Sequence, residues 1–301
     1  MLKTPILFII FNRPFETKRV FDSIRKAKPK ELYIAADGPR LNNNKDIENS
    51  KLSRDIVKNI DWDCNVNYLF REDNLGCKVA VSTAINWFFK NVEEGIIIED
   101  DCLPNDSFYK FCSILLEKYR FDLEIMHIGG TNFQNYNSNL NDSYYFSRIT
   151  HVWGWATWKS AWIKYDQLMI DYNETNLKNI FKLNNFNHES FSYFLKAFKN
   201  VKENKIDTWD YQWTYTVWKE NGLAIIPNEN LVSNIGFNTN STHTIDGGEI
   251  YGNLKTYNLE KVVHPILKEV NINADNYTFK KWFVKRTLLK RLLNKIYKRL
   301  K

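Results

Sequence analysis

Three adjacent carboxylates, Glu99–Asp101, directly follow a short apolar run, Gly95–Ile98. A run of this kind predicts a buried strand, so the acidic side chains should emerge together where the strand ends. Like charges this close repel one another, and a cation between them relieves the repulsion. Carboxylate oxygens suit Mn²⁺ or Mg²⁺, which keep coordination positions for phosphate oxygens. We therefore expect a Mn²⁺ or Mg²⁺ site here. The alternative is an acidic cluster at the start of the next helix, capped by Asn105 or Asp106.

Groups suited to a nucleoside diphosphate follow other apolar runs of the chain. Arg13 lies just beyond the run Ile6–Phe11. Because the ends of parallel strands meet at one edge of a sheet, its guanidinium is expected opposite the acidic triplet. Asp37 follows the next run and is suited to accept from a base N–H or a ribose hydroxyl. Lys78 opens a predicted helix whose N-terminus favours phosphate. Each basic residue alone is also compatible with a plain surface charge, but their recurrence at strand ends favours a site.

The elements that must position these residues alternate over the first 130 residues. Short apolar runs and amphipathic stretches in alternation favour an α/β fold with a mainly parallel central sheet covered by helices. In such sheets ligands bind at the carboxyl ends of the strands. The predicted strands are residues 6–11, 32–36, 66–70, 95–98 and 125–128. The predicted helices are residues 15–27, 47–60 and 79–89, with a further helix around Leu115 and Leu116.

From residue 131 the chain becomes first polar and then rich in aromatic residues. Residues 131–147 are predicted to form a long loop, and helical spacing indicates helices over 187–202 and 208–220. Most of the ten Trp residues lie in this half. Trp162 and Trp218 stand at helical spacing, which favours the core over a binding pocket.

No Pro-, Gly- or Ser-rich linker divides the chain, so we expect one catalytic domain over residues 1–270. Within it, residues 1–130 are expected to bind a nucleotide sugar and residues 131–270 to face an acceptor. Residues 271–301 are expected to form a basic amphipathic tail ending in a C-terminal helix.

The net charge of +7 is concentrated at the C-terminal end. Residues 280–301 hold ten Lys and Arg and no acidic residue; without those ten, 32 basic residues face 35 acidic ones, a charge of about −3. Apolar residues recur there every three or four positions, as in helices that lie on anionic membranes. The alternatives to a membrane surface are that this segment binds a partner helix or packs one face against the rest of the protein. No nucleic-acid partner is expected, because the body is acidic and shows no recognition module.

Together these motifs resemble those of GT-A glycosyltransferases, whose nucleotide-sugar fold is marked by a DxD or EDD triplet. Over residues 4–245 the chain is similar to inverting bacterial family-two-like transferases and to the N-acetylglucosaminyltransferase I family. The resemblance implies a GT-A (Rossmann-like) nucleotide-diphospho-sugar transferase fold. It also implies that Arg13 contacts the nucleotide diphosphate and Asp37 the uracil ring. Asp100 would contact the ribose and Asp101 the divalent metal.

Residues 151–158 extend the resemblance, because they are similar to the Gly-Trp motif that closes over the sugar pocket. Gly154 and Trp155 are the motif residues here. A rigid aromatic wall suits a sugar ring, whose C–H faces are apolar while its edges form hydrogen bonds.

Residues 207–213 resemble the Trp-Asp segment that supplies the catalytic base. Asp210 is the first choice for the group that removes the acceptor proton, and Asp207 is the second. The alternative for Asp210 is a carboxylate that binds backbone N–H groups at a helix start. His243 is suited to donate to the diphosphate or to ligate the metal, and the alternative is an ordinary loop histidine.

The resemblance implies a metal-dependent inverting glycosyltransferase that moves GlcNAc or another hexose from a UDP-sugar to a glycan or lipid-linked acceptor. Surface polysaccharide assembly in the cytoplasm, at the inner face of the membrane, is the expected setting. One alternative is a catalytically silent carbohydrate-binding or scaffold protein. Another is a sugar-phosphate nucleotidyltransferase, but Phe11–Phe15 lacks the glycines usual in the first loop of such enzymes.

Overall fold

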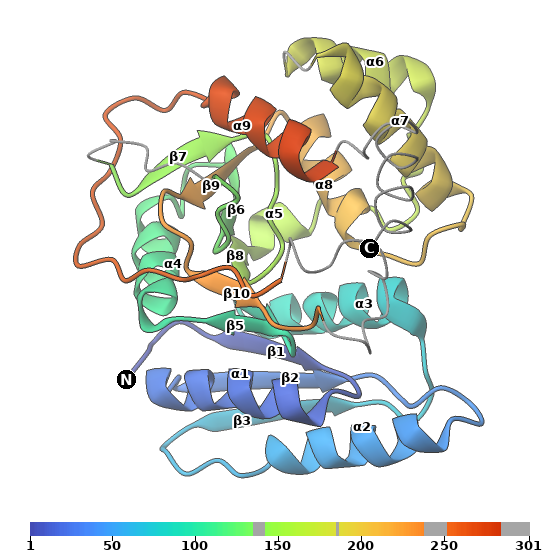
Figure 1. The fold of residues 1–301 in the computed structure, drawn as a ribbon, viewed down its shortest axis with the longest axis vertical. Coiled ribbons are helices and arrows are strands. Elements are labelled where there is room, and N and C mark those ends of the chain that lie inside the picture. Colours follow the sequence, from blue (N-terminus) through green and yellow to red (C-terminus); the bar gives the residue numbers. More distant parts are fainter. Residues whose placement is uncertain (135–141, 185–186, 238–251, 284–301) are drawn as a thin grey trace, which may run out of the picture.

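The computed structural model describes residues 1–134, 142–184, 187–237 and 252–283. Within these residues an eight-stranded sheet crosses the molecule in the order β3-β2-β1-β4-β8-β6-β9-β7, and a two-stranded sheet pairs β10 with β5 (Figure 1). The strands of the large sheet are β1 (Ile6–Ile10), β2 (Glu31–Ala36), β3 (Asn65–Phe70), β4 (Glu94–Glu99), β6 (Ile125–Gly129), β7 (Tyr144–Ser147), β8 (Trp155–Trp158) and β9 (Leu223–Pro227). The small sheet consists of β5 (Cys102–Pro104) and β10 (Val232–Asn234).

The five strands predicted from the sequence are all present, as β1, β2, β3, β4 and β6. The first four run parallel, and Ile9 of β1 lies between Ala35 of β2 and Glu99 of β4. Alternate residues of β1 enter different cores: Phe8 packs with α1 and α4, whereas Leu7 packs with α3 and the Trp-rich region. Burial on both faces explains the nearly continuous apolar strands.

The second half of the sheet adds antiparallel strands to a sheet that is mainly parallel, as predicted. β8 runs antiparallel between β4 and β6, and β7 pairs antiparallel with β9. The predicted loop over 131–147 is therefore wrong at its end, because Tyr144–Ser147 form a fully buried strand. Its aromatic residues favour a strand, but the Asn-rich stretch before them hid that signal. The fold is α/β with a mixed, largely parallel sheet covered by helices.

Helices cover both faces of the sheet, and several begin at an Asn side chain. The helices are α1 (Pro14–Ala27), α2 (Asn44–Ile56), α3 (Gly76–Asn91), α4 (Asp106–Lys118), α5 (Lys159–Trp162), α6 (Glu174–Leu183), α7 (His188–Lys202), α8 (Asp210–Lys219) and α9 (Ile272–Thr278). Side-chain oxygens that accept a backbone N–H in the first turn belong to Asn43, Asn105, Asn173, Asn187 and Asn271. Each such cap contributes about 1 kcal/mol. Asn105 is thus the cap of α4, while the acidic triplet belongs to the end of β4.

The two larger hydrophobic cores each contain residues from both halves of the chain. Trp162 and Trp218 are 3% and 1% exposed, which confirms their prediction as core residues. The division of roles at residue 130 stays a prediction about function, since one sheet runs through both halves.

The segment after residue 270 packs against the body instead of leaving it. The buried carboxylate of Asp275 accepts hydrogen bonds from Ser147 Oγ at 2.5 Å and from the Arg148 backbone N–H at 2.8 Å. Phe279, in a π-helical turn over Phe279–Phe283, is also buried. The first part of the predicted tail therefore belongs to the fold, while residues 284–301 lie outside the described residues.

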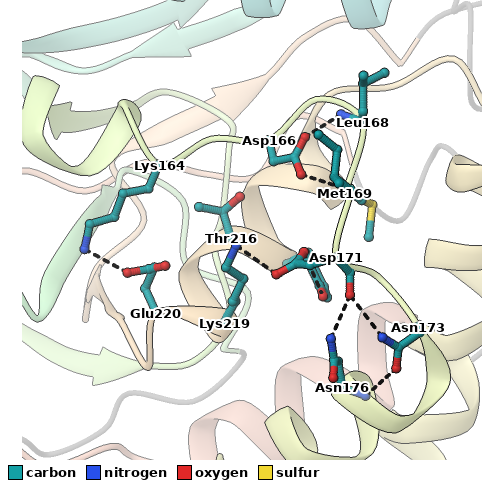
Figure 2. Close-up of polar contacts among 12 residues, drawn as sticks. Lys164, Asp166, Leu168, Met169, Asp171, Asn173, Asn176, Thr216, Lys219 and Glu220 are labelled. Carbon is teal, nitrogen blue, oxygen red and sulfur yellow. Dashed lines mark hydrogen bonds and ion pairs between the residues drawn. The ribbon is translucent and has the colours of Figure 1, made fainter.

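The C-terminal end of α8 is tied to the segment between α5 and α6 (Figure 2). Lys219 pairs with Asp171 at 2.9 Å, and Glu220 pairs with Lys164 at 2.9 Å. Exposed pairs of this kind contribute little stability each, and these two lie at the end of α8 opposite Asp210. Among the described residues, none of the helices combines the length and apolar character that a membrane span requires.

Candidate functional site

The acidic triplet and Arg13 meet where β4 and β1 end. Arg13 Nη1 lies 3.1 Å from Asp100 Oδ1 and 2.5 Å from Asp101 Oδ2. This is the position expected from the converging ends of parallel strands. Burial lowers the pKa of Arg13, but Asp100 and Asp101 outweigh that effect and raise it, so the guanidinium stays charged.

Asp100 is the most firmly held member of the triplet. One of its oxygens accepts from Arg13 and the other from the Phe11 backbone N–H at 2.9 Å, and the residue is 4% exposed. Asp100 therefore fastens the end of β4 to the end of β1. The side chain of Asp101 is more open, at 15% exposure, and its Oδ1 contacts the Cys102 thiol at 3.5 Å.

The triplet concentrates more negative charge than Arg13 neutralises. Burial raises the pKa of Glu99, and the neighbouring carboxylates of Asp101 and Asp100 raise it further, against the opposing effect of Arg13. Asp210 adds to the same effect, which places its charge within electrostatic reach of Glu99. A second cation here would relieve this repulsion.

The chain offers a divalent ion few ligands of its own. Among the described residues, no group of three or more His, Cys, Asp or Glu side chains is arranged to hold a metal. Asp101 still fits a single oxygen ligand, because its side chain is partly exposed. Mg²⁺ is typically bound by one or two carboxylates together with waters and substrate phosphates. The residues present therefore fit an ion held together with a bound diphosphate, not an ion held by protein side chains alone.

Gly236 lies against the carboxylate of Asp101, where a Cβ atom would collide with Oδ2. The Ile235 backbone N–H donates to the Asp101 carbonyl at 2.7 Å, so the chain after β10 is seated on the acidic triplet. This contact was not predicted from the sequence, where its one local signal is a glycine two residues after the short strand β10. His243, eight residues after Ile235, lies outside the described residues.

Asp37 ends β2, as predicted, but its carboxylate is engaged with its own chain. It accepts from the Leu75 backbone N–H at 3.1 Å and from Asn74 Nδ2 at 3.0 Å. Burial raises the pKa of this carboxyl, partly offset by its hydrogen bonds from Leu75 and Gly38. Asp37 thus holds the loop before α3, and its contact with a uracil ring stays a prediction.

The N-terminus of α3, which the sequence analysis assigned to phosphate, carries a protein carboxylate. Asp207 accepts from the backbone N–H groups of Cys77 at 2.8 Å and Lys78 at 3.1 Å. The Lys78 ammonium donates to Asn204 Oδ1 at 2.6 Å. Gly76, with φ at +76°, leaves room for Asp207. The backbone N–H of Lys78 therefore binds Asp207. Asp207 caps α3, whose own N-cap residue supplies no side-chain hydrogen bond.

Asp210 is the first residue of α8 and borders a cavity of about 180 Å³. Its Oδ1 accepts from the Tyr211 backbone N–H at 2.9 Å and from the Thr208 hydroxyl. The helix-start role considered for this carboxylate is therefore present in the structure. It does not prevent Asp210 from facing a ligand, because the same side chain belongs to the cavity wall. Other residues of that wall are Phe133, His151, Trp153, Thr214 and Trp282.

Trp155 does not form a wall of this cavity. It is 1% exposed in β8 and stacks on His127 and Trp209, with ring centroids 5.1 and 5.5 Å apart. Trp155 is the first residue of β8 and packs in the core, whereas Trp153 lies before the strand and borders the cavity. The prediction that Trp155 faces a sugar pocket therefore needs correction in favour of Trp153.

Gly154 supports this region through its backbone. It has φ at +64°, and a Cβ atom would lie 2.9 Å from Val232 Cγ2. Its carbonyl accepts from the Gly130 N–H at 2.8 Å. A glycine is required here by conformation and by space, which accounts for the motif without a direct contact to a ligand.

Trp282 joins the cavity from the segment that the sequence analysis assigned to a membrane tail. Its indole stacks on Phe133 at 4.2 Å, and its Nε1–H donates to the Phe133 carbonyl at 3.1 Å. Phe133 was not among the predicted site residues, and Trp282 lies in the segment for which a membrane surface was the first expectation and packing on the body an alternative. An aromatic residue among basic ones indicates an amphipathic helix, but it does not say which surface the aromatic residue covers.

No protein-family description matches the chain, and no curated protein matches it. Among solved structures the chain is similar to S. aureus TarS 1-349, at 9% identity and a TM-score of 0.39, over 77% of this chain and 59% of that one. It is also similar to 4-diphosphocytidyl-2C-methyl-D-erythritol synthase from Anaerococcus prevotii, at 10% identity and a TM-score of 0.36, over 62% of this chain and 85% of that one. A third similar structure is UDP-glucose pyrophosphorylase complexed with UDP-glucose, at 12% identity and a TM-score of 0.36, over 75% and 90%. Similarities at this level assign no activity to the chain.

Proposed function

We propose that this chain is a metal-dependent inverting glycosyltransferase. It would transfer GlcNAc or another hexose from a UDP-sugar donor to a glycan or lipid-linked acceptor. The observation that carries the proposal is the pairing of Arg13 with Asp100 and Asp101 at the ends of two adjacent parallel strands. The charge of Asp210 acts on Glu99, the third carboxylate of this cluster. This edge of a parallel sheet is where α/β enzymes bind nucleotides.

Arg13 and Asp101 are proposed to share the diphosphate of the donor. Arg13 would exchange its contact with Asp101 for phosphate oxygens, and Asp101 would then be released as a ligand for Mn²⁺ or Mg²⁺. The bound ion would neutralise charge on the departing nucleoside diphosphate. Glu99 and Asp100 would maintain the negative field that attracts the ion, and Asp100 would accept a hydrogen bond from the ribose.

Asp210 is proposed as the general base. It would remove the proton of the acceptor hydroxyl while that oxygen attacks the anomeric carbon and the bond from this carbon to UDP breaks. Proton transfer of this kind contributes roughly 10²–10⁴-fold. Asp207 is the weaker candidate, because both of its oxygens accept backbone N–H groups at the start of α3.

The finer setting is also part of the proposal. A surface polysaccharide pathway at the inner face of the membrane would supply a lipid-linked acceptor, and residues 280–301 would bind the anionic lipids. Lys280 and Lys281 are exposed, which is compatible with contact to lipid headgroups.

The test is donor turnover with a panel of UDP-sugars, with Mn²⁺ and with EDTA. Hydrolysis or transfer that requires Mn²⁺ is expected. Adding pyrophosphate distinguishes a nucleotidyltransferase from a glycosyltransferase. A nucleotidyltransferase would convert the UDP-sugar and pyrophosphate into UTP and a sugar 1-phosphate. Sugar binding with no turnover under any of these conditions would instead support the silent carbohydrate-binding protein.

Asp101→Asn tests the metal assignment with little change in shape. We expect it to lose most of the Mn²⁺-dependent part of UDP binding, measured by calorimetry. Asp106→Ala, which removes an exposed carboxylate in the first turn of α4, is the matched control and should bind UDP normally. Equal UDP affinity of Asp101→Asn and wild type in Mn²⁺ would overturn the assignment of Asp101.

A further inference from the structure

The cavity beside Asp210 is walled mainly by aromatic side chains. Phe133 stacks on Trp282, and Trp153 meets Phe133 edge-on, with ring centroids 5.2 Å apart. Flat apolar walls of this kind suit the C–H faces of a sugar ring. Arg13 and the acidic triplet are not among the described residues of the wall, whereas Asp210 borders the cavity and its charge also acts on Glu99.

The charge of the cavity wall restricts what it can hold. Among the described residues that line it there is no Lys or Arg, whereas Asp210 supplies a carboxylate. A phosphate or carboxylate group placed inside would be desolvated without a cation and repelled by Asp210. The wall therefore favours an uncharged ligand.

His151 supplies an unpaired acceptor in this wall. It is 3% exposed, and its Nδ1 lies 2.7 Å from the Thr131 carbonyl oxygen. Because a carbonyl oxygen only accepts, Nδ1 carries the proton. Burial lowers the pKa of His151 to about 4, which keeps the ring neutral, so Nε2 bears a lone pair. Within the described residues this buried Nε2 has no hydrogen-bond partner.

The neighbouring His127 is a histidine with a purely structural role, and it serves as a comparison for His151. Its Nε2 donates to the His151 carbonyl at 3.0 Å, and its Nδ1 accepts from the Trp213 indole N–H at 3.2 Å. Both nitrogens of His127 are thus partnered inside the protein. A buried acceptor without a partner, as in His151, is unfavourable, and a donor bound in the cavity that His151 borders would supply the missing hydrogen bond.

We propose that this cavity binds a neutral, hydroxylated sugar ring of the acceptor, and that one hydroxyl of that ring donates a hydrogen bond to Nε2 of His151. The inference rests on the proposed function, because Asp210 is the proposed base and borders the same cavity. His151 is then a residue that selects the acceptor, and Trp153 supplies a face on which its ring packs. Acceptors with a phosphate or carboxylate on this ring are rejected.

Saturation-transfer NMR on the full chain tests this with four methyl glycosides: glucoside, galactoside, N-acetylglucosaminide and the charged glucuronide. At least one neutral glycoside should receive saturation on its ring C–H protons and bind more tightly than the glucuronide. Trp153→Ala should weaken that binding at least about tenfold, through loss of a packing face. His151→Phe should weaken it about 3- to 10-fold, the net effect of one hydrogen bond. His264→Phe, outside the cavity wall, is the matched control and should bind as wild type.

Absence of saturation for every neutral glycoside overturns the proposal, as does unchanged affinity in both cavity variants. If His151→Phe fails to fold, Trp153→Ala and the neutral-to-charged comparison decide. UDP binding with Mn²⁺ is titrated on the same samples. UDP binding without glycoside binding refutes this inference and leaves the proposed function standing. Glycoside binding without UDP binding refutes the proposed function and leaves a sugar-binding cavity.

Discussion

Two substitutions of Asp207 distinguish a structural role of its carboxylate from a catalytic one. Its carboxylate accepts the backbone N–H groups of Cys77 and Lys78 at the start of α3, a helix of 16 residues. Loss of a capping side chain costs about 0.5–2 kcal/mol, and loss of a negative charge at a helix N-terminus costs about 0.3–1 kcal/mol. Because Asp207 is exposed, the charge effect is near the lower end, so Asp207→Ala should cost about 1–2 kcal/mol. Asp207→Asn keeps a capping oxygen and should cost less than about 1 kcal/mol.

The assay combines urea denaturation and thermal denaturation, both followed by Trp fluorescence, with sugar transfer. An unfolding entropy of about 2.1 cal/mol/K per residue makes each kcal/mol worth about 2 °C in Tm for a chain of this length. Asp207→Ala should therefore melt about 2–3 °C lower than wild type. Asp207→Asn should transfer sugar within about twofold of wild type, since a cap does not exchange protons. Asp73→Ala, an exposed carboxylate in the loop before α3, serves as the control for charge removal.

Two outcomes would refute this reasoning about Asp207. Unchanged stability of Asp207→Ala would mean that the two backbone hydrogen bonds contribute nothing measurable. A loss of transfer by about 100-fold in Asp207→Asn at wild-type stability would make Asp207 the base.

The remaining predictions concern Asp210 and Asp275. Asp210→Asn should retain donor binding and lose roughly 10²–10⁴-fold in transfer, measured as single-turnover rates; transfer near the wild-type rate would place the base elsewhere. Burial raises the pKa of Asp275 to about 6, so the folded state binds this proton more tightly than the unfolded chain. At about pH 4 this group contributes up to about 3 kcal/mol to the free energy of unfolding, and that contribution is lost as the pH rises to about 6. Asp275→Asn should remove that part of the pH dependence in urea denaturation from pH 4 to 7, and an unchanged slope would contradict it.

Strands β1, β2 and β4 of the parallel half were predictable because each of them is buried on both faces of the sheet. Apolar runs such as Ile6–Ile10 carry this signal without reference to any neighbour, and the polar residues after them mark the edge of the sheet. Arg13 and Asp101 could thus be placed at one edge before any contact was known. β7 was missed, because four buried residues beside an Asn-rich stretch carry too short a pattern to be recognised.

Partnerships between distant residues were beyond sequence reasoning. Asp207 and Cys77 are 130 positions apart, and nothing in either segment indicates that one caps the other. Trp153 and Trp155 have the same side chain two positions apart, yet one borders the cavity and the other packs in the core.

The sequence by itself determined the α/β pattern, the acidic end of β4 and the cation expected opposite it, because burial and strand ends are encoded in local runs. The tertiary structure decided which carboxylates stay open to a ligand. The carboxylate oxygens of Asp37 and Asp207 accept hydrogen bonds from the loop before α3 and from its first turn, whereas Asp101 pairs with Arg13 and Asp210 borders the cavity. It also turned Trp282 from an expected membrane contact into part of a cavity wall. These outcomes depend on how chain segments far apart in sequence satisfy one another's hydrogen bonds and apolar surfaces, which no local pattern specifies.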